Sequence, residues 1–302
     1  MKFSILITTK NRLTDLIISL NSMNSIINRD DVELIICDDG SNDGTANYIA
    51  THFPKVQLII NEVSEGYIVN RNKMLNITKA QYAISLDDDA NFLSENPLEE
   101  IEKYFIENVN CGLIAFRIFW GRHKPNSLFS ADKAETVKSF VGCGHVWRIA
   151  AWKKISNYPE WFGFYGEEDF ASMELYKKKI EVHYLPSILV HHRVDISARK
   201  KSYDYQWRLR RSYRSGWYLF CLYYPVKFIP KRLIYSIWIQ LKTKTFKGDI
   251  KATLAIFQAM SDIFINLPKL LKHSNRFTIE EFKKYLTITD PKIFWKPNER
   301  EN

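Results

Sequence analysis

The stretch Tyr82-Ala83-Ile84-Ser85-Leu86-Asp87-Asp88-Asp89 joins a short apolar run to three adjacent carboxylates. A short apolar run that ends in charge is typical of a buried β-strand in a parallel sheet. Adjacent carboxylates repel one another, so a folded chain tolerates them in open solvent or around a cation. The aspartates alone therefore leave two alternatives: an acidic surface turn, or a site for a hard divalent ion that itself carries a diphosphate.

Short apolar runs and helical patterns alternate around this stretch over the first 120 residues. The strand-like runs are residues 3–7, 32–37, 56–60, 82–86 and 112–119. The helical patterns are residues 13–27, 45–52, 67–77 and 97–106. This alternation predicts an α/β fold with a mostly parallel sheet and helices on both faces.

Polar clusters follow three of these strands directly. They are Thr8-Thr9-Lys10-Asn11-Arg12, Asp38-Asp39 and Asp87-Asp88-Asp89. In open parallel sheets, ligands bind in the crevice beyond the carboxyl ends of the strands. We therefore expect the three clusters to meet along one edge of the sheet and to form a site there.

The composition limits the class of protein. The 302 residues include 46% hydrophobic and 25% charged residues, which is typical of a globular chain with a substantial core. The net charge of +9 favours an anionic partner. The four cysteines (Cys37, Cys111, Cys143, Cys221) have neither a metal-ligand spacing nor the density of a disulfide framework, so we expect a reducing cytosol. We expect neither a signal sequence at residues 3–7 nor a membrane span at 217–226 or 254–271, since a span needs roughly 20 apolar residues.

Taken together, the motifs resemble those of the family 2 glycosyltransferases of the GT-A fold, over about residues 3–195. The matching motifs are Ile7-Thr8-Thr9-Lys10-Asn11-Arg12, Cys37-Asp38-Asp39-Gly40-Ser41, Arg71-Asn72, Leu86-Asp87-Asp88-Asp89, Gly166-Glu167-Glu168-Asp169-Phe170 and Val190-His191-His192. The resemblance implies a Rossmann-like GT-A domain at 1–195, with a nucleotide-sugar half at about 1–120 and an acceptor half at about 121–195. A helical C-terminal region, with a possible membrane association, would follow at 196–302.

The resemblance also implies a nucleotide pocket. Thr8, Asn11 and Arg12 would line it, and Asp39 would accept a hydrogen bond from the N–H of the base. Arg71 would approach the base or the phosphates. Two alternatives remain open: an Asx-type turn that simply ends a strand at 38–41, and a solvated helix charge at Arg71.

For the metal site the resemblance implies Mn²⁺ or Mg²⁺. Asp87 and Asp88 would address the ribose and orient the ion, and Asp89 would bind it. His191 or His192 would be the third protein ligand, and imidazole suits Mn²⁺ better than Mg²⁺. Which two acids form the working D-x-D pair stays open, and so does the alternative that the two histidines pack at a strand end.

The general base implied by the resemblance is Asp169. Crowding in Glu167-Glu168-Asp169 raises the pKa of at least one of these acids. The alternative is that the acids stabilise the N-terminus of a helix without catalysis. The loop Gly142-Cys143-Gly144-His145 would contact the sugar and the acceptor. The nearby aromatics Trp161, Phe162 and Tyr165 would stack on a sugar or pack in the core.

The C-terminal region begins with a basic stretch. Residues 199–214 hold seven Lys/Arg (Arg199, Lys200, Lys201, Arg208, Arg210, Arg211, Arg214) and one acid, Asp204. The aromatics Trp217, Tyr218, Phe220, Tyr223 and Tyr224 follow. We favour a peripheral patch on an anionic membrane over a solvated helix that leads to packed helices. The predicted location is the cytoplasm, and the favoured membrane patch would place the chain at the inner face of the cell membrane. The chain lacks the Q-x-x-R-W motif of processive synthases.

These features predict an inverting, metal-dependent glycosyltransferase. It would move a sugar from a nucleoside diphosphate sugar, with UDP favoured over dTDP or GDP, to a hydroxyl of a glycan or lipid-linked glycan. Three alternatives remain: a nucleic-acid-binding protein that uses Arg208, Arg210 and Arg211, a sugar nucleotidyltransferase, and a non-catalytic relative. The acidic clusters disfavour the first, and the lack of a glycine-rich loop in residues 8–12 disfavours the second.

Overall fold

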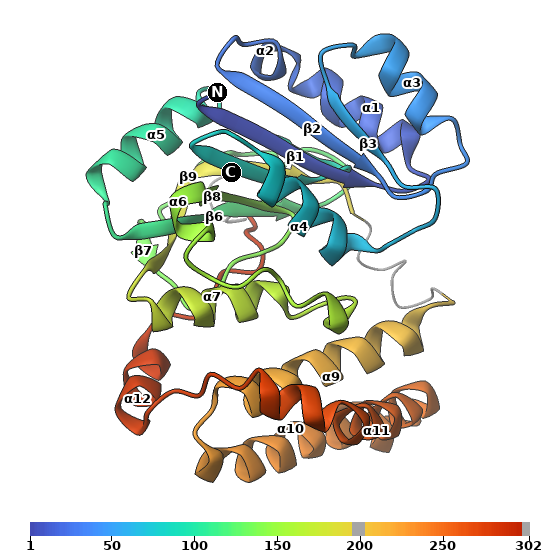
Figure 1. Ribbon diagram of the computed structural model, residues 1–302, viewed down its shortest axis with the longest axis vertical. Helices are drawn as coiled ribbons and strands as arrows, with labels where there is room; N and C mark the ends of the chain where they lie inside the picture. The colour runs from blue at the N-terminus through green and yellow to red at the C-terminus, as the bar shows by residue number, and fades with distance from the viewer. Residues whose placement is uncertain (195–202, 298–302) are drawn as a thin grey trace.

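The alternating apolar and amphipathic segments form a sheet covered by helices on both faces. The structure is a computed structural model that describes residues 1–194 and 203–297 (Figure 1). Its strands are β1 (Phe3–Thr9), β2 (Val32–Asp38), β3 (Gln57–Ile60), β4 (Tyr82–Asp87), β5 (Ala90–Phe92), β6 (Cys111–Trp120), β7 (Glu135–Thr136), β8 (Gly144–Arg148) and β9 (Glu181–His192). Its helices are α1 (Leu13–Ser22), α2 (Asn24–Ile27), α3 (Thr45–His52), α4 (Tyr67–Ile77), α5 (Pro97–Glu107), α6 (Ile149–Trp152), α7 (Glu167–Lys177), α9 (Tyr205–Tyr223), α10 (Ile229–Thr243), α11 (Ile250–Lys272) and α12 (Ile279–Thr287).

The sheet is mixed, with a parallel first half. Within the described residues the strand order is β3-β2-β1-β4-β8-β6-β9-β5, and β7 pairs with β9. The pairs β1/β2, β1/β4, β2/β3 and β6/β9 are parallel. The strands β8, β5 and β7 are antiparallel to their neighbours. The predicted α/β class, with strands and helices alternating over the first 120 residues, is confirmed.

The sheet buries a hydrophobic cluster on each face, because successive side chains of a strand point to opposite sides. In β1, Phe3, Ile5 and Ile7 join the cluster that includes side chains of α1, α3 and α5. Leu6 of the same strand joins the other cluster, which includes side chains of α4, α7 and α9. Because helices cover both faces of the sheet, the ends of its strands, rather than its faces, remain accessible to a ligand.

The C-terminal end of β9 lies at the same edge of the sheet as the C-terminal ends of β1 and β4. Its register with β6 jumps between Phe116↔Leu185 and Arg117↔Leu189, so that β9 bulges there. Beyond the bulge, His192 pairs with Trp120 of β6 and with Ala90 of β5. The end of β9 therefore reaches the residues that follow β4.

The helices α9, α10 and α11 form a separate layer, with α9 lying between α7 and the other two (Figure 1). Trp217, Tyr218 and Tyr223 of α9 are buried. The predicted membrane role of this aromatic series is therefore wrong for these three side chains, because they form the contact between α9 and its neighbours. The predicted boundary at 195–196, together with Arg199, Lys200 and Lys201, lies outside the described residues.

The chain returns to the sheet after α11. The segment after α12 forms β-bridges from Thr289 to Val137 and from Trp295 to Phe119. Lys138 also donates to Asp290 at 2.9 Å. The last described residues thus pack on the first domain, so the C-terminal region is not confined to the helical layer.

The helix α11 is long and apolar enough to cross a membrane, although the sequence was expected to contain no such segment. Among the described residues it is the one helix long and apolar enough to cross a membrane by length and composition, with a mean hydropathy of 1.3. The polar residues that interrupt it were expected to exclude a span, yet they do not break the helix. Of its most apolar window, 28% is buried inside the protein.

Candidate functional site

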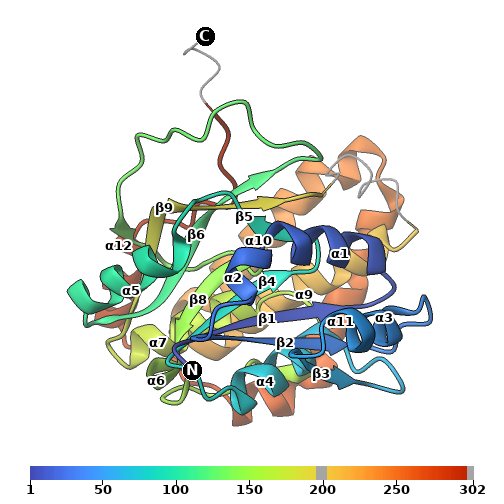
Figure 2. The same ribbon diagram turned by 90° about the horizontal axis from the view of Figure 1, so that it is seen from above.

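The loops after β1, β2 and β4 meet at one edge of the sheet, as the sequence predicts (Figure 2). Thr8 lies level with Asp87 across the β1/β4 pair. Asn11 connects two of the loops: its backbone N–H donates to Ser41 Oγ at 2.9 Å, and its Oδ1 accepts from the N–H of Asn42 at 2.7 Å. Its φ of 53° lies in the left-handed region, which asparagine tolerates. Asn11 therefore holds the loop after β1 against the loop after β2. The predicted contact of Asn11 with the nucleotide would lie in this loop.

The two aspartates after β2 have different partners. Asp38 Oδ1 accepts the N–H of Ser41 at 3.0 Å, which is the turn that the structural alternative predicts. Asp39 instead accepts from Asn61 Nδ2 at 2.9 Å, from Ser64 Oγ at 2.6 Å and from two backbone N–H groups of the following loop. Burial alone would raise the pKa of Asp39, but hydrogen bonds such as that from Ser64 outweigh it and lower the pKa to about 2. Asp39 is thus a fixed anion at this edge.

Asp88 points toward β1 and α1. Its Oδ2 accepts from Thr9 Oγ1 at 2.9 Å, and its backbone carbonyl accepts from Ser19 Oγ at 2.6 Å. Arg12 Nη1 lies 3.3 Å from Asp88 Oδ1, and Arg12 Nη2 lies 2.6 Å from Asp89 Oδ2. Burial raises the pKa of Asp88 to about 7, against the opposing effect of Arg12. Arg12 is thus the cation that compensates the acidic turn.

Asp87 and Asp89 face His192 at the end of β9. His192 Nε2 lies 3.0 Å from Asp89 Oδ1 and 3.8 Å from Asp87 Oδ2. One ligand atom each of Asp87, His192 and Cys143 lie within 4.8 Å of one another. Burial would raise the pKa of Asp89, but His192 and Arg12 hold it well below its usual range. Burial would lower the pKa of His192, but Cys143 and Asp89 raise it to about 11.

This donor set fits a divalent cation. Carboxylate oxygens suit Mg²⁺ and Mn²⁺, and an imidazole ligand suits Mn²⁺ better than Mg²⁺. An imidazole must lose its proton to ligate a metal, so binding would release the proton that the two carboxylates now stabilise. Because Asp88 points away, Asp87 and Asp89 are the pair that can act together. That Asp87 and Asp89 form the working pair therefore remains a prediction.

Of the two histidines, only His192 lies in this cluster. Alternation along β9 turns His191 to the opposite face, where its Nε2 lies 2.7 Å from the carbonyl oxygen of Gly121. Its ring lies 5.7 Å from that of Phe119. His191 therefore packs at the strand end, as the structural alternative predicts, and it does not reach Asp87.

Arg71 of α4 is buried, with 2% of its surface exposed. Its Nη2 donates to Asp87 Oδ1 at 3.0 Å and also to the carbonyl oxygen of Gly142. Its guanidinium lies 4.0 Å from the centroid of the Tyr67 ring. The alternative of a solvated helix charge is therefore wrong. Arg71 orients Asp87 from the side opposite to His192.

Glu168 lies on the same side of the site as Arg71. A Cβ atom on Gly142 would lie 2.6 Å from Glu168 Oε1 and 3.1 Å from Arg71 Nη1, so glycine is needed for this close approach. The carboxyl groups of Glu167 and Glu168 share a hydrogen bond. Burial and the charge of Glu167 raise the pKa of Glu168 well above its usual value. Glu168 is therefore harder to deprotonate than an ordinary glutamate.

Asp169 points elsewhere. It lies on a solvent-accessible face of α7 and accepts a hydrogen bond from Ser139. The entry to α7 is formed by Tyr165 and Gly166, with φ of 67° and 87°. A Cβ on Gly166 would lie 2.8 Å from Ser215 Cβ. In the first turn of α7, Glu168 therefore points toward Arg71 and Asp169 points toward Ser139. The sequence did not reveal that these two neighbouring acids have different partners.

The other predicted contact residues are mainly structural. Phe162 is fully buried, and the Trp161 ring packs 5.1 Å from that of Tyr218. His145 is also fully buried, its ring lies 4.4 Å from that of Phe140, and burial together with the charge of Arg71 lowers its pKa well below its usual value. Of the loop 142–145, Gly142 and Cys143 reach the site.

A hollow next to His192 was missed by the sequence analysis. It measures about 790 Å³ and is lined by residues 119–132 together with the distant segment 295–297. The ring of Trp120, at its border, lies edge-on to that of His192 with centroids 5.9 Å apart. The Trp295 ring lies 4.3 Å from the guanidinium of Arg117. No local pattern could connect Trp295 with this edge, because it is more than 100 residues away in the chain.

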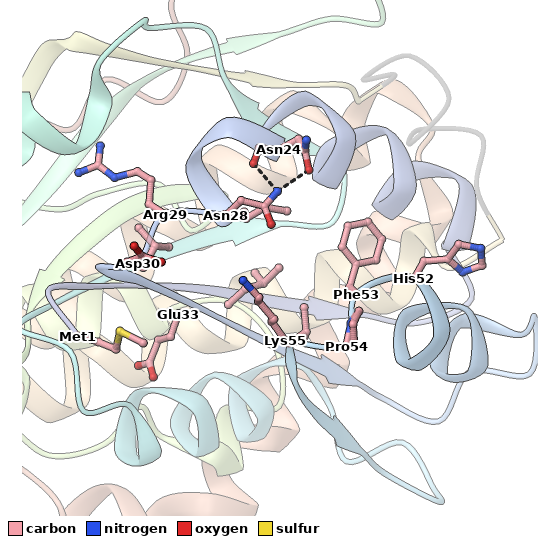
Figure 3. A pocket seen from close by; sticks show the side chains of 14 residues that line it. Met1, Asn24, Asn28, Arg29, Asp30, Glu33, His52, Phe53, Pro54 and Lys55 are labelled. Carbon is pink, nitrogen blue, oxygen red and sulfur yellow. Dashed lines mark hydrogen bonds between the residues drawn. The ribbon is translucent and has the colours of Figure 1, made fainter.

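A second hollow, of about 530 Å³, lies at the amino ends of β2 and β3 (Figure 3). Arg29, Asp30, Glu33 and Lys55 give it charges of both signs. Arg29 is already paired with Asp31, at 2.9 Å. This hollow is at the opposite end of the strands from the clustered aspartates, and it has no part in the site.

The basic residues at the start of α9 are mostly engaged within the protein. Arg208 Nε donates to Asp204 Oδ2 at 2.6 Å, and Arg210 donates to both oxygens of Asp262 at 2.6 and 2.8 Å. The guanidinium of Arg211 lies 3.7 Å from the centroid of the Trp207 ring. These contacts weaken the case for a nucleic-acid interface or a membrane patch at this stretch.

Comparison with protein families gives one match. Residues 4–142 match the model of the glycosyl transferase family 2. Comparison with curated protein sequences gives no match.

Solved structures with a similar fold are glycosyltransferases. The S. aureus TarS fragment 1–349 in complex with UDP-GlcNAc is 18% identical, with a TM-score of 0.58, 88% of this chain covered and 81% of that one. GalNAc-T7 with UDP, GalNAc and Mn²⁺ is 13% identical, with a TM-score of 0.63, 91% of this chain covered and 58% of that one. The mannosyltransferase PcManGT from Pyrobaculum calidifontis, with GDP-Man and Mn²⁺, is 14% identical, with a TM-score of 0.56 and coverage of 95% and 79%. Against a longer S. aureus TarS structure, the match spans 38% of that chain. At these identities the similarity shows the GT-A fold.

Proposed function

Because the chain carries a family 2 glycosyltransferase domain with a GT-A fold, we propose that it transfers a sugar from a nucleoside diphosphate sugar to a hydroxyl group of a glycan or lipid-linked glycan. The observation that carries this proposal is the cluster of Asp87, Asp89 and His192 beside Arg71 and Glu168. In this cluster the aspartates and His192 would hold a divalent cation, and Glu168 would accept a proton. Both lie at the edge where parallel sheets bind their ligands.

The nucleotide occupies the side formed by β1 and β2. Thr8, Arg12 and Asp39 lie at the carboxyl ends of these strands, with Asp39 held as an anion by its hydrogen bonds. An anionic acceptor suits the N–H of a uracil ring. UDP is favoured on this ground, and two of the similar structures contain UDP or UDP-GlcNAc, although a third contains GDP-Man.

Asp87, Asp89 and His192 are the residues that would hold Mn²⁺ or Mg²⁺. A ligand atom of Cys143 also lies within 4.8 Å of those of Asp87 and His192. When bound, the ion stabilises the negative charge on the departing nucleoside diphosphate. Arg71 keeps Asp87 in the orientation that this role requires. Arg12, which compensates Asp88 and Asp89, adds positive charge on the phosphate side.

Glu168 and Asp169 are the two candidates for the general base of an inverting transfer. The base takes the proton of the acceptor hydroxyl while that oxygen attacks the anomeric carbon, and the diphosphate leaves from the opposite face. The sequence motif favours Asp169. The geometry favours Glu168, whose carboxylate approaches Gly142 and Arg71 and whose pKa is raised.

The acceptor binds in the hollow beside His192. Its lining includes the aromatic rings of Phe119, Trp120, Phe129 and Trp295, and such rings stack on the apolar faces of sugars. Lys124 and Lys296 add positive charge to the same lining, which also contains Asp132. A glycan that carries phosphate or carboxylate groups fits this combination.

The test is calorimetric binding of UDP, dTDP, GDP and a short oligonucleotide, each with and without Mn²⁺. Metal-dependent binding of one nucleoside diphosphate is the expected result. It identifies the nucleotide with which donor sugars are then screened, and NMR of the product gives its anomeric configuration. Metal-independent binding of the oligonucleotide alone would contradict the proposal and restore the nucleic-acid alternative.

Release of pyrophosphate from a sugar phosphate and a nucleoside triphosphate would instead identify a nucleotidyltransferase.

The cysteines Cys37, Cys111, Cys143 and Cys221 are all free, as suits an enzyme of the reducing cytoplasm.

A further inference from the structure

The helices α10 and α11 expose an unusual number of large apolar side chains, which we call the outer face. Phe264 and Ile265 are 72% and 73% exposed, and Trp238 is 51% exposed. The outer face consists of Ile234, Tyr235 and Trp238 of α10, Phe246 between the two helices, and Ile250, Leu254, Phe257, Phe264, Ile265, Leu267 and Leu271 of α11. Single exposed apolar residues are ordinary, but a set of this size on two adjacent helices marks an interaction surface.

The pattern along α11 is the reverse of that of an ordinary surface helix. Exposed positions 250, 254, 257, 264 and 271 follow one another at helical spacing and carry Ile, Leu or Phe. Three of the six buried residues of α11 are alanines (Ala252, Ala255 and Ala259). Ala255 and Ala259 pack with Tyr213 and Trp217 of α9. The larger apolar surface thus points away from the protein, which is stable only where something other than water covers it.

The charge around the outer face has one sign. Seven exposed lysines lie on these two helices or directly beside their ends: Lys227, Lys231, Lys242, Lys247, Lys251, Lys269 and Lys272. Within residues 225–275, all of which the structure describes, the acids are Asp249 and Asp262, and neither is exposed. Asp249 caps α11 by accepting the N–H of Ala252 at 2.9 Å, and Asp262 binds Arg210.

This combination of an apolar face and a basic rim complements an anionic lipid surface. Apolar side chains enter the boundary between head groups and acyl chains, and each lysine near the surface gains attraction to anionic head groups. A second copy of the chain fits less well, because a symmetric contact would bring lysine rim against lysine rim with no exposed carboxylate between them.

The helix α11 lies in the plane of such a surface, because polar contacts fix its inner side to α9. Tyr205 Oη donates to Asp249 at 2.8 Å, Arg210 pairs with Asp262 at 2.6 Å, and Asn266 Nδ2 donates to Tyr218 Oη at 2.8 Å. These contacts are distributed along the helix. A span would have to break them or to carry α9 and its arginines into the bilayer.

We propose that this chain attaches to anionic phospholipid bilayers through the outer face of α10 and α11, with both helices in the plane of the interface. In Figure 1 these helices lie on the side of α9 opposite α7, so attachment leaves the sheet and its carboxyl edge on the water side. The attachment itself does not depend on the proposed transferase activity, but it brings the site close to a lipid-linked acceptor.

The experiment is co-sedimentation with vesicles of phosphatidylcholine alone and of phosphatidylcholine with phosphatidylglycerol. Wild-type protein should sediment with the anionic vesicles, and much less with the neutral ones. The double variant Phe257→Glu/Phe264→Glu should bind the anionic vesicles roughly tenfold or more weakly, because two charges enter the apolar face. The matched control Ile106→Glu/Val109→Glu changes two exposed apolar residues elsewhere and adds the same charge, so it should bind like wild type.

Further measurements keep the outcomes distinct. Release of the wild type by alkaline carbonate supports attachment in the plane, whereas release by detergent alone overturns it in favour of a span. Equal vesicle binding by wild type and Phe257→Glu/Phe264→Glu overturns the surface assignment. A dimer in sedimentation velocity that this variant abolishes, without vesicle binding, assigns the face to a second copy. Calorimetric nucleotide binding in the same variant should be unchanged, which separates a failure here from a failure of the proposed function.

Discussion

The carboxyl edge of the sheet and the outer face of α10 and α11 break the usual distribution of residues in opposite ways. At the edge, Asp88, Asp89 and Arg71 are charged and buried. On the outer face, residues such as Phe264 are apolar and exposed. Buried charges need partners, and exposed apolar surface needs a cover. The comparison supports the two proposals in different ways: buried charge at the edge suits a polar ligand, and exposed apolar surface on the helices suits a lipid surface.

The two regions also differ in whether other side chains of the protein supply the partners that they need. At the edge, Arg12 and His192 neutralise the acids, so the site is held together before any ligand arrives. On the outer face no side chain of the described residues plays that role for the apolar groups. Substitutions at the edge should therefore change chemistry and affinity, and substitutions on the outer face should change attachment alone.

The largest effect is expected for Asp89→Asn. It keeps the shape of the side chain but removes the charge that faces both His192 and Arg12. Metal-dependent nucleotide binding should be lost, and transfer should fall by roughly 10³-fold or more. Calorimetry with and without Mn²⁺, together with initial rates, measures both. Asp31→Asn, which removes a carboxylate paired with Arg29 at the far edge, is the control and should retain activity. Retained metal-dependent binding in Asp89→Asn would move the ion elsewhere.

The next effect distinguishes the two candidates for the base. Glu168→Gln should lower kcat by roughly 10²-fold or more if Glu168 takes the proton, with nucleotide affinity nearly unchanged. Asp169→Asn should then cost much less. Because the pKa of Glu168 is raised, the rate should fall as the pH is lowered through that pKa, and this acid limb should persist in Asp169→Asn. The reverse ranking of the two variants would return the role to Asp169.

Gly142→Ala tests the same position without removing a carboxylate. The added methyl group would lie 2.6 Å from Glu168 Oε1, so the end of this flexible side chain must move. Activity should fall while the melting temperature changes little. An active Gly142→Ala variant would show that the position of Glu168 is not critical.

The sequence was sufficient to predict β1, β2, β3, β4 and β6, and the edge where the polar ends of β1, β2 and β4 meet, but it gave no bounds for β5, β7, β8 or β9. Apolar runs with polar ends determine where parallel strands stop, and the chain order β1, β2, β4 then brings residues 8–12, 38–39 and 87–89 together. Those features are local. They do not depend on how side chains pack, which explains why the fold class was confirmed.

The direction of individual side chains could not be predicted in this way. Asp88 and Asp87 are neighbours, yet one binds Thr9 and the other Arg71, because the turn after β4 sends them to opposite sides. The aromatic series of α9 looked like a membrane surface, but Trp217 is core because α11 covers it. Tertiary packing decides such cases, and the apolar surface that remains exposed lies one helix further on.

A smaller effect is expected for Asp39→Asn. The amide would present N–H groups to donors such as Ser64 Oγ and the backbone of Gly66 that now approach a carboxylate. Leaving such groups unsatisfied costs about 1–3 kcal/mol of stability, and nucleotide affinity should fall about tenfold if the base contact is also lost. Denaturant unfolding and calorimetry measure the two effects. Unchanged affinity in a destabilised variant would make Asp39 a purely structural anion.

The smallest effect is expected for Trp295→Ala, which tests whether the two regions are as separate as they look. Trp295 comes from the C-terminal region, but it packs on Phe119 and Arg117 beside the site. Loss of one aromatic surface should raise the acceptor KM by roughly threefold to tenfold, at about 0.5–1.5 kcal/mol. The donor Kd should stay constant, as should vesicle binding. Ile293→Ala, an exposed neighbour outside the hollow, is the control. A change in donor Kd with an unchanged acceptor KM would move the acceptor out of this hollow, and a loss of vesicle binding would mean that the tail connects the two regions.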